Sequence, residues 1–114
     1  MADPTLHEKR PDAEVIVYGD ASPITAAEWH CARLVFAWCR GAALRLAPCG
    51  SGWSATARGG GCIYVVAVAK RDDAVAGVAR MLSDAVRGYT TGRQRNSKRA
   101  ARLRALIAEG GDHG

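Results

Sequence analysis

Three residues in this sequence have side chains that could support nucleophilic catalysis. Cys49, between Pro48 and Gly50, and Ser51, in Gly-Ser-Gly, are the candidate nucleophiles, and His30 is the candidate base. Such a nucleophile needs its base within hydrogen-bond reach. His30, however, falls on the polar stripe of a predicted helix, and no local motif joins it to either nucleophile. The Gly-Ser-Gly run leads into a strand and does not open a helix, which favours a hairpin turn over a phosphate-binding loop. The pattern therefore predicts a protein that is not an enzyme.

The sequence also predicts no metal site and no cofactor. Its four cysteines contain no Cys-x-x-Cys pair, and the adjacent Asp72 and Asp73 suit the start of a helix. The N-terminus lacks the pattern of an export signal, and no apolar run reaches the roughly 18 residues of a membrane span. We therefore expect a cytoplasmic protein that does not enter a membrane and keeps its cysteines reduced.

A basic segment carries the main functional prediction. The stretch from Arg87 to Arg104 contains no Asp or Glu, and its cations are Arg87, Arg93, Arg95, Lys98, Arg99, Arg102 and Arg104. Clustered Lys and Arg attract polyanions, and contacts to phosphates need no reading of base sequence. Tyr89 is the only aromatic residue nearby, and single strands are usually held by aromatic stacking. The predicted partner is thus a nucleic acid, either a duplex or a structured RNA, bound with little sequence preference.

The arginine content of this segment also has causes unrelated to nucleic acid. Arginine can be abundant because the genome is GC-rich, and a charged helix face can simply be solvated. The acidic residues 1–30 could also fold against the basic segment, within a chain or across a dimer. The alternative function is a stoichiometric protein inhibitor or adaptor that docks on a larger complex, such as a phage or mobile-element counter-defence protein of the anti-CRISPR kind.

Periodicity predicts a small α+β domain with an antiparallel sheet and helices packed on one face. Strands are expected at residues 14–18, 43–47, 52–58 and 62–69, and helices at 25–40, from 72 or 73 to 89, and after the cap at 96–97. The middle of this β-α-β-β-β-α-α order is similar to that of double-stranded-RNA-binding domains and of one lobe of HicB-type antitoxins. A shared order of elements transfers no function.

Residues 62–69 form an unbroken apolar run, which predicts the central strand of the sheet. The strand at 14–18 is expected at an edge. Residues 1–12 are predicted to be a mobile lead, 13–89 the compact domain, and 90–114 a basic arm and helix with a disordered tail.

The helix at 25–40 is apolar on most of its circumference, which predicts that it is covered on two sides. The second cover is either the C-terminal helices or another subunit. We favour a homodimer with Phe36 and Trp38 in its interface.

Overall fold

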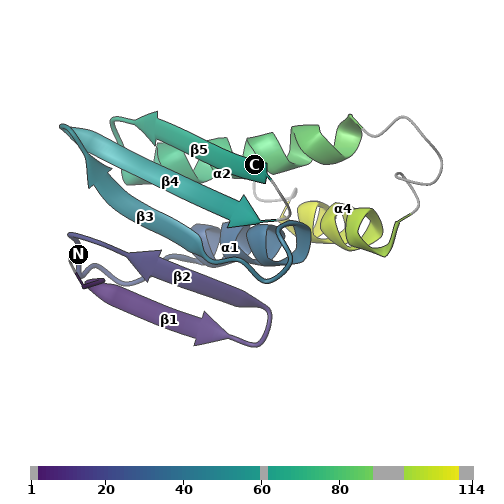
Figure 1. Cartoon of the computed structure of the whole chain (residues 1–114), viewed down its shortest axis with the longest axis horizontal. Helices are drawn as coiled ribbons and strands as arrows, with labels where there is room; N and C mark the ends of the chain where they lie inside the picture. The colour runs from purple at the N-terminus through teal and green to yellow at the C-terminus, as the bar shows by residue number, and fades with distance from the viewer. Residues whose placement is uncertain (1–2, 60–61, 89–96, 111–114) are drawn as a thin grey trace.

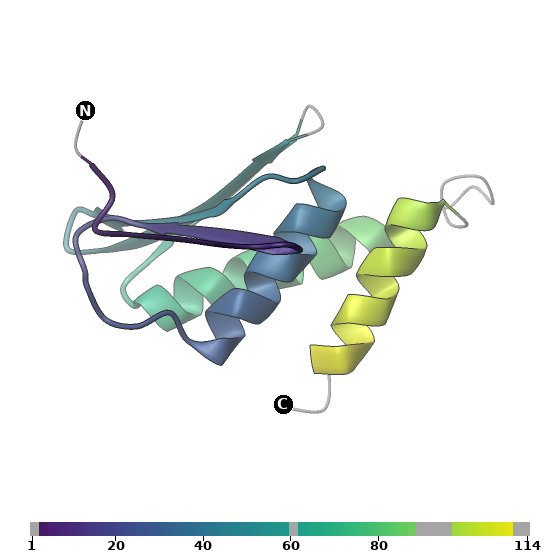
Figure 2. The same ribbon diagram turned by 90° about the horizontal axis from the view of Figure 1, so that it is seen from below.

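The computed structural model describes residues 3–59, 62–88 and 97–110. In these ranges a five-stranded sheet carries three helices on one face, as Figures 1 and 2 show, which confirms the predicted α+β class. In chain order the elements are β1 (Leu6–Arg10), β2 (Ala13–Val17), α1 (Ala26–Trp38), β3 (Leu44–Cys49), β4 (Gly52–Gly59), β5 (Cys62–Val68), α2 (Arg71–Arg87) and α4 (Lys98–Gly110).

The sheet is mixed, and the expectation of a purely antiparallel sheet was wrong. The strand order is β1-β2-β3-β4-β5, and β2 and β3 run parallel because α1 crosses over between them. The strand predicted at 14–18 is β2, which lies inside the sheet because β1 pairs with its outer side. β1 itself falls within residues 1–12, which were predicted to be a mobile lead. Its sequence, Leu-His-Glu-Lys-Arg, gave little sign of a strand because all but Leu6 is exposed and charged or polar.

β5 lies at the edge of the sheet, so its assignment as the central strand was wrong. In the described part of the chain it pairs with β4 alone. An apolar run shows that neither face of a strand carries charge. It does not show whether the strand pairs with one neighbouring strand or with two. Here Tyr64 and Val66, on the face toward the helices, pack against the core, whereas Ile63 and Val65 on the other face are exposed.

α1 begins with the predicted capping box. The Thr25 side chain accepts from the Glu28 backbone N–H (3.1 Å), and the Glu28 carboxylate accepts from the Thr25 backbone N–H (2.9 Å). The helix ends slightly earlier than predicted, with its C-cap at Cys39. Arg40 and Gly41 then turn the chain with φ of 55° and 85°.

The apolar circumference of α1 is covered within a single chain. The sheet lies on one side, α2 lies beside the helix, and α4 packs across it (Figure 2). Of the two covers that the sequence allowed, the C-terminal helices therefore supply the second one. α4 begins as predicted, with the Ser97 hydroxyl accepting from the Ala100 N–H (3.1 Å), and buries its apolar line of Ala100, Leu103 and Leu106.

Gly77 in α2 faces β5 at close range, as its unfavourable position inside a helix suggested. A Cβ at this position would lie 2.7 Å from Val66 Cγ1. We expect Gly77→Ala to lower the free energy of unfolding by about 1 to 2 kcal/mol, because the stiff, branched Val66 cannot move aside, even though Ala is intrinsically about 1 kcal/mol better in a helix. Urea unfolding measures the change. Ala76→Gly, at the exposed neighbouring position, is the control and should cost only the helix propensity. A Gly77→Ala protein more stable than the wild type would contradict the close contact.

Candidate functional site

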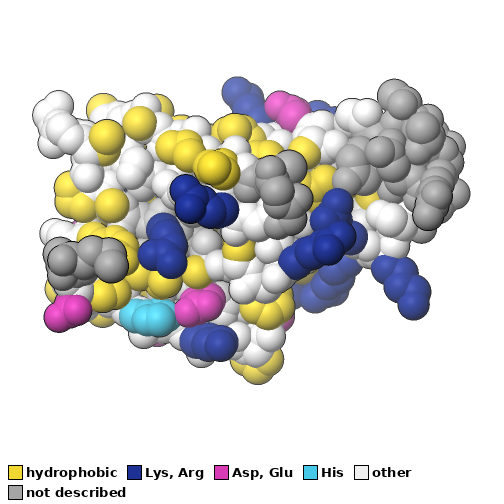
Figure 3. Space-filling view, viewed as in Figure 1, with side chains coloured by type: hydrophobic (Ala, Val, Ile, Leu, Met, Phe, Trp, Pro, Cys, Tyr) yellow, Lys and Arg dark blue, Asp and Glu magenta, His cyan; other side chains and the backbone are white. Residues whose placement is uncertain are grey.

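Cationic side chains from distant parts of the sequence meet where α1 ends and α4 begins. The Arg99 guanidinium lies 4.5 Å from the centroid of the Trp38 ring, which places the first turn of α4 beside the last turn of α1. Arg40, just after α1, and Arg102, in α4, line one groove. We call Arg40, Lys98, Arg99 and Arg102 the arginine-rich end. Figure 3 shows Lys and Arg side chains gathered near α4, with acidic side chains over the β1–β2 side of the same face.

The groove at this end has a volume of about 380 Å³ and an apolar floor that includes Phe36 and Leu106. Arg33, on its wall, is bound by acids: its Nε donates to Asp12 Oδ2 (3.0 Å), and its Nη2 lies 3.4 Å from Glu109 Oε2. Arg40 and Arg102, by contrast, are exposed at the groove. The groove therefore presents two solvated guanidinium groups beside an internally neutralised one.

The first turn of α4 adds to the positive potential. It contains Lys98 and Arg99 and no acidic residue. Cations at a helix N-terminus oppose the helix dipole, and the unpaired N–H groups there favour anions. This end of α4 is consequently suited to contact with a negatively charged partner.

Arg40 also occupies an unusual backbone conformation for its residue type. Its φ of 55° is in the left-handed region, which glycine and asparagine adopt more easily. Gly41 directly follows, so the turn could be made with less strain by a second glycine. Arginine at this position therefore costs backbone stability that glycine would not.

The structure divides the basic residues predicted from the sequence. Lys98, Arg99 and Arg102 lie together at the arginine-rich end, with Arg99 half-buried on Trp38. Arg104 is half-buried on the other flank of α4, and Arg87 lines a separate hollow with Arg80 and Asp84. Arg93 and Arg95 lie outside the described residues.

Sequence reasoning missed Arg40. Its position at the end of a predicted helix was visible, whereas its proximity to Arg102, 62 positions later, depends on how α4 packs on α1.

Of the two residues predicted for a dimer interface, Trp38 is buried within the chain. It is 6% exposed, lies beneath Arg99, and donates from Nε1 to the Tyr64 hydroxyl (2.9 Å). Phe36 is half-buried in the groove at the arginine-rich end. The apolar character of α1 therefore does not require a second subunit.

An ion-pair network around the buried Glu28 ties the starts of α1 and α2 together. Arg71 Nε and Nη2 donate to the two carboxylate oxygens of Glu28 (2.6 and 2.9 Å), and Nη1 donates to Asp20 Oδ2 (3.0 Å). Glu28 is 1% exposed, so Arg71 and the Thr25 N–H take the place of water around its carboxylate. Hydrogen bonds from the Ser22 backbone and hydroxyl, followed by the bond from Arg71, lower the pKa of Asp20 below its ordinary value of 3.8. Hydrogen bonds and charge from Glu28 and then Asp20 raise the pKa of Arg71, against the effect of its burial.

This network bears on one alternative raised by the sequence, that the acidic residues 1–30 fold against the basic segment. The acidic residues Asp12, Asp20 and Glu28 bind Arg33 and Arg71, both outside the segment from Arg87 to Arg104. These three N-terminal acids thus have partners other than that basic segment.

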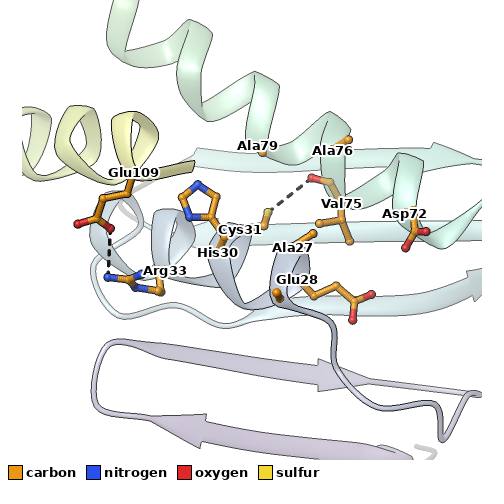
Figure 4. Close-up of a pocket in the computed structure, with 11 residues that line it drawn as sticks. Ala27, Glu28, His30, Cys31, Arg33, Asp72, Val75, Ala76, Ala79 and Glu109 are labelled. Atoms are coloured by element: carbon orange, nitrogen blue, oxygen red, sulfur yellow. Dashed lines mark hydrogen bonds and ion pairs between the residues drawn. The ribbon is translucent and has the colours of Figure 1, made fainter. Parts of the chain in front are cut away.

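A second cavity, of about 500 Å³, lies between α1 and α2 (Figure 4). His30 and Cys31 point into it, next to the Arg33–Glu109 ion pair. The Cys31 thiol donates to the Val75 carbonyl (3.6 Å), and burial raises its pKa to about 12, so it is not a thiolate at neutral pH. The candidate nucleophiles Cys49 and Ser51 are at the β3–β4 turn, outside the lining of this cavity.

Among the described residues, no cluster of His, Cys, Asp and Glu could hold a metal ion. In the same ranges, no helix has the length and apolarity needed to cross a membrane. Comparisons of the chain with protein families, with curated proteins and with solved structures find no match.

Proposed function

We propose that this protein is a non-enzymatic, cytoplasmic binding protein whose arginine-rich end contacts the phosphates of a nucleic acid. The observation that supports this most directly is that the exposed Arg40 and Arg102, from two separate segments, line one groove. The exposed Lys98 lies about one helical turn before Arg102 in α4. Two features of this end cost stability: the cations Lys98 and Arg99 lie at the start of a helix, and Arg40 has a positive φ. Binding of a polyanion would give a reason for keeping these residues.

The environments of two tryptophans favour backbone contact over base stacking. Trp38 is covered by Arg99, and Trp29 is covered by Arg10, whose guanidinium lies 3.7 Å from its ring centroid. Both rings are almost fully buried, so neither can stack on a splayed base. A duplex or a structured RNA, held by its phosphates, therefore fits this surface better than a single strand.

The test is the triple variant Arg40→Gln, Lys98→Gln, Arg102→Gln, which leaves the Arg99–Trp38 contact in place. At about 0.1 M salt each lost phosphate contact should weaken binding roughly eightfold, and each should reduce the slope of log affinity against log salt by about 0.9. Fluorescence anisotropy with labelled duplex DNA and RNA, at about 50 and about 200 mM salt, measures both quantities. Thermal stability should be equal to or higher than that of the wild type, because Lys98 opposes the dipole of α4.

A matched control removes the same number of charges elsewhere. Lys9, Lys70 and Arg80 are all exposed, and the variant Lys9→Gln, Lys70→Gln, Arg80→Gln has the same net charge as the test variant. The control should keep most of the affinity and of the salt slope. Equal losses in the two variants would show that net charge alone drives binding. If the wild type binds neither duplex even at about 50 mM salt, nucleic acid is not the partner, and the inhibitor or adaptor hypothesis replaces it.

A further inference from the structure

The two edges of the sheet differ in their chemistry. β1, at one edge, carries His7, Glu8, Lys9 and Arg10, and charged side chains discourage pairing with another strand. β5, at the other edge, is Cys-Ile-Tyr-Val-Val-Ala-Val and contains neither a charge nor a proline. An edge strand leaves a row of N–H and C=O groups that a further strand can pair with. β5 therefore lacks the features that usually block strand addition.

β5 also holds the exposed large hydrophobic residues of the described ranges. Ile63 is 57%, Val65 52% and Val68 38% exposed. Ile63 and Val65 lie on the open face of the sheet, where their neighbours across β4 are the hydrophilic residues Arg58 and Thr56. Figure 3 shows hydrophobic side chains along the β5 side of this face. The described part of the chain leaves these side chains in water.

We propose that β5 pairs antiparallel with β5 of a second copy of this chain, joining the two sheets into one. A pairing centred on Val65 places Val65 opposite its own counterpart and Ile63 opposite Ala67 of the second copy. Residues directly opposite in an antiparallel pair point to the same face, so apolar side chains meet on the open side. The strand is uncharged, so this register sets no like charges against each other, although each copy has a net charge of +5.

The same lack of charge favours self-pairing over a foreign strand. A foreign strand would have to be uncharged and apolar toward the open face as well, and β5 of a second copy meets this requirement along the whole register. α2 runs beneath β5, with Gly77 directly against Val66, so the α2 helices of the two copies would flank the joint on the helix side (Figure 1). A seven-residue strand is only about 23 Å long, so the interface is small and we expect micromolar dissociation. This interface is independent of the arginine-rich end.

Sedimentation equilibrium of the full chain tests the proposal. From about 10 to about 500 µM, the weight-average mass of the wild type should rise from the 12.1 kDa of one chain toward twice that value. Val65→Lys should stay at the mass of one chain throughout, because it sets two ammonium groups against each other at the centre of the joint. Val65 is exposed, so the circular dichroism of this variant should match that of the wild type.

The matched control is Thr56→Lys, which places the same charge on the same face, directly across from Val65 on β4. It should dimerise as the wild type does. A second measurement places one new cysteine in a Cys49→Ser, Cys62→Ser background, in which the remaining Cys31 and Cys39 are buried. Val65→Cys should form a disulfide-linked dimer on mild oxidation, and Thr56→Cys should not. The proposal is overturned if the wild type keeps the mass of one chain up to about 500 µM. This is the result expected if the edge takes a foreign strand. The proposal is also overturned if Val65→Lys and Thr56→Lys lose the dimer equally. That result would indicate that the open faces of two sheets pack against each other.

Discussion

Arg71→Met is expected to lower the free energy of unfolding by about 3 to 5 kcal/mol. The variant keeps the length of the side chain but leaves the carboxylate of Glu28, which is 1% exposed, without its cationic partner. A buried charge without compensation is among the most destabilising changes in a protein interior. Urea unfolding followed by tryptophan fluorescence gives the value, since the chain has three tryptophans.

The double variant Glu28→Gln, Arg71→Met provides the control. Glutamine is close in shape to Glu28 and can still accept the Thr25 N–H, and no charge is then left buried. We expect the double variant to be more stable than Arg71→Met alone, so that the two substitutions are strongly coupled. If Arg71→Met costs less than about 1 kcal/mol, the ion pair behaves like one at the surface, and the network does not hold the two helices together.

Trp38→Ala is expected to cost about 3 to 5 kcal/mol as well. The substitution removes a large buried ring, its hydrogen bond to Tyr64 and the surface on which Arg99 lies. Because Trp38 joins α1 to β5 and to the first turn of α4, this loss should also weaken the docking of α4. Thermal unfolding measures the first effect, and amide hydrogen exchange of residues 98–110 measures the second.

Two smaller substitutions separate the contributions of this tryptophan. Trp38→Phe keeps a ring beneath Arg99 and should cost less than Trp38→Ala. Tyr64→Phe removes only the acceptor of the indole N–H, at about 1 to 3 kcal/mol. The mass of folded Trp38→Ala at each concentration should equal that of the wild type, because the ring is covered by its own chain. If this substitution instead dissociates a dimer, Trp38 lies in a subunit interface.

Local signals in the sequence were sufficient for most of the elements. The Thr25–Glu28 capping box, the Ser97 cap and the apolar line of Ala100, Leu103 and Leu106 all involve residues within one or two helical turns of each other. Their geometry follows from the backbone of a single helix. The bounds of α1 and β4 and the start of α4 could therefore be predicted closely, as could the α+β class.

The order of the strands in the sheet was harder to predict. The composition of a strand indicates how far its side chains are buried, but not which strands pair with it. β1 is charged and yet forms a ladder with β2, which changes the strand at 14–18 from an edge into an interior strand. β5 is apolar and yet lies at an edge. The parallel pairing of β2 and β3 depends on how α1 packs across the sheet, which no local pattern specifies.

The sequence by itself determined the helices, their caps, the alternation of the strands and the excess of arginine near the C-terminus. The tertiary structure alone decided which arginines are internal and which face the solvent. Arg71 reaches Glu28 across 43 positions and is largely covered, whereas Arg40 and Arg102 meet at the groove between α1 and α4 and stay exposed. The physical reason is that a charge is neutralised or left in water according to what packs around it, and those neighbours come from segments far apart in the chain.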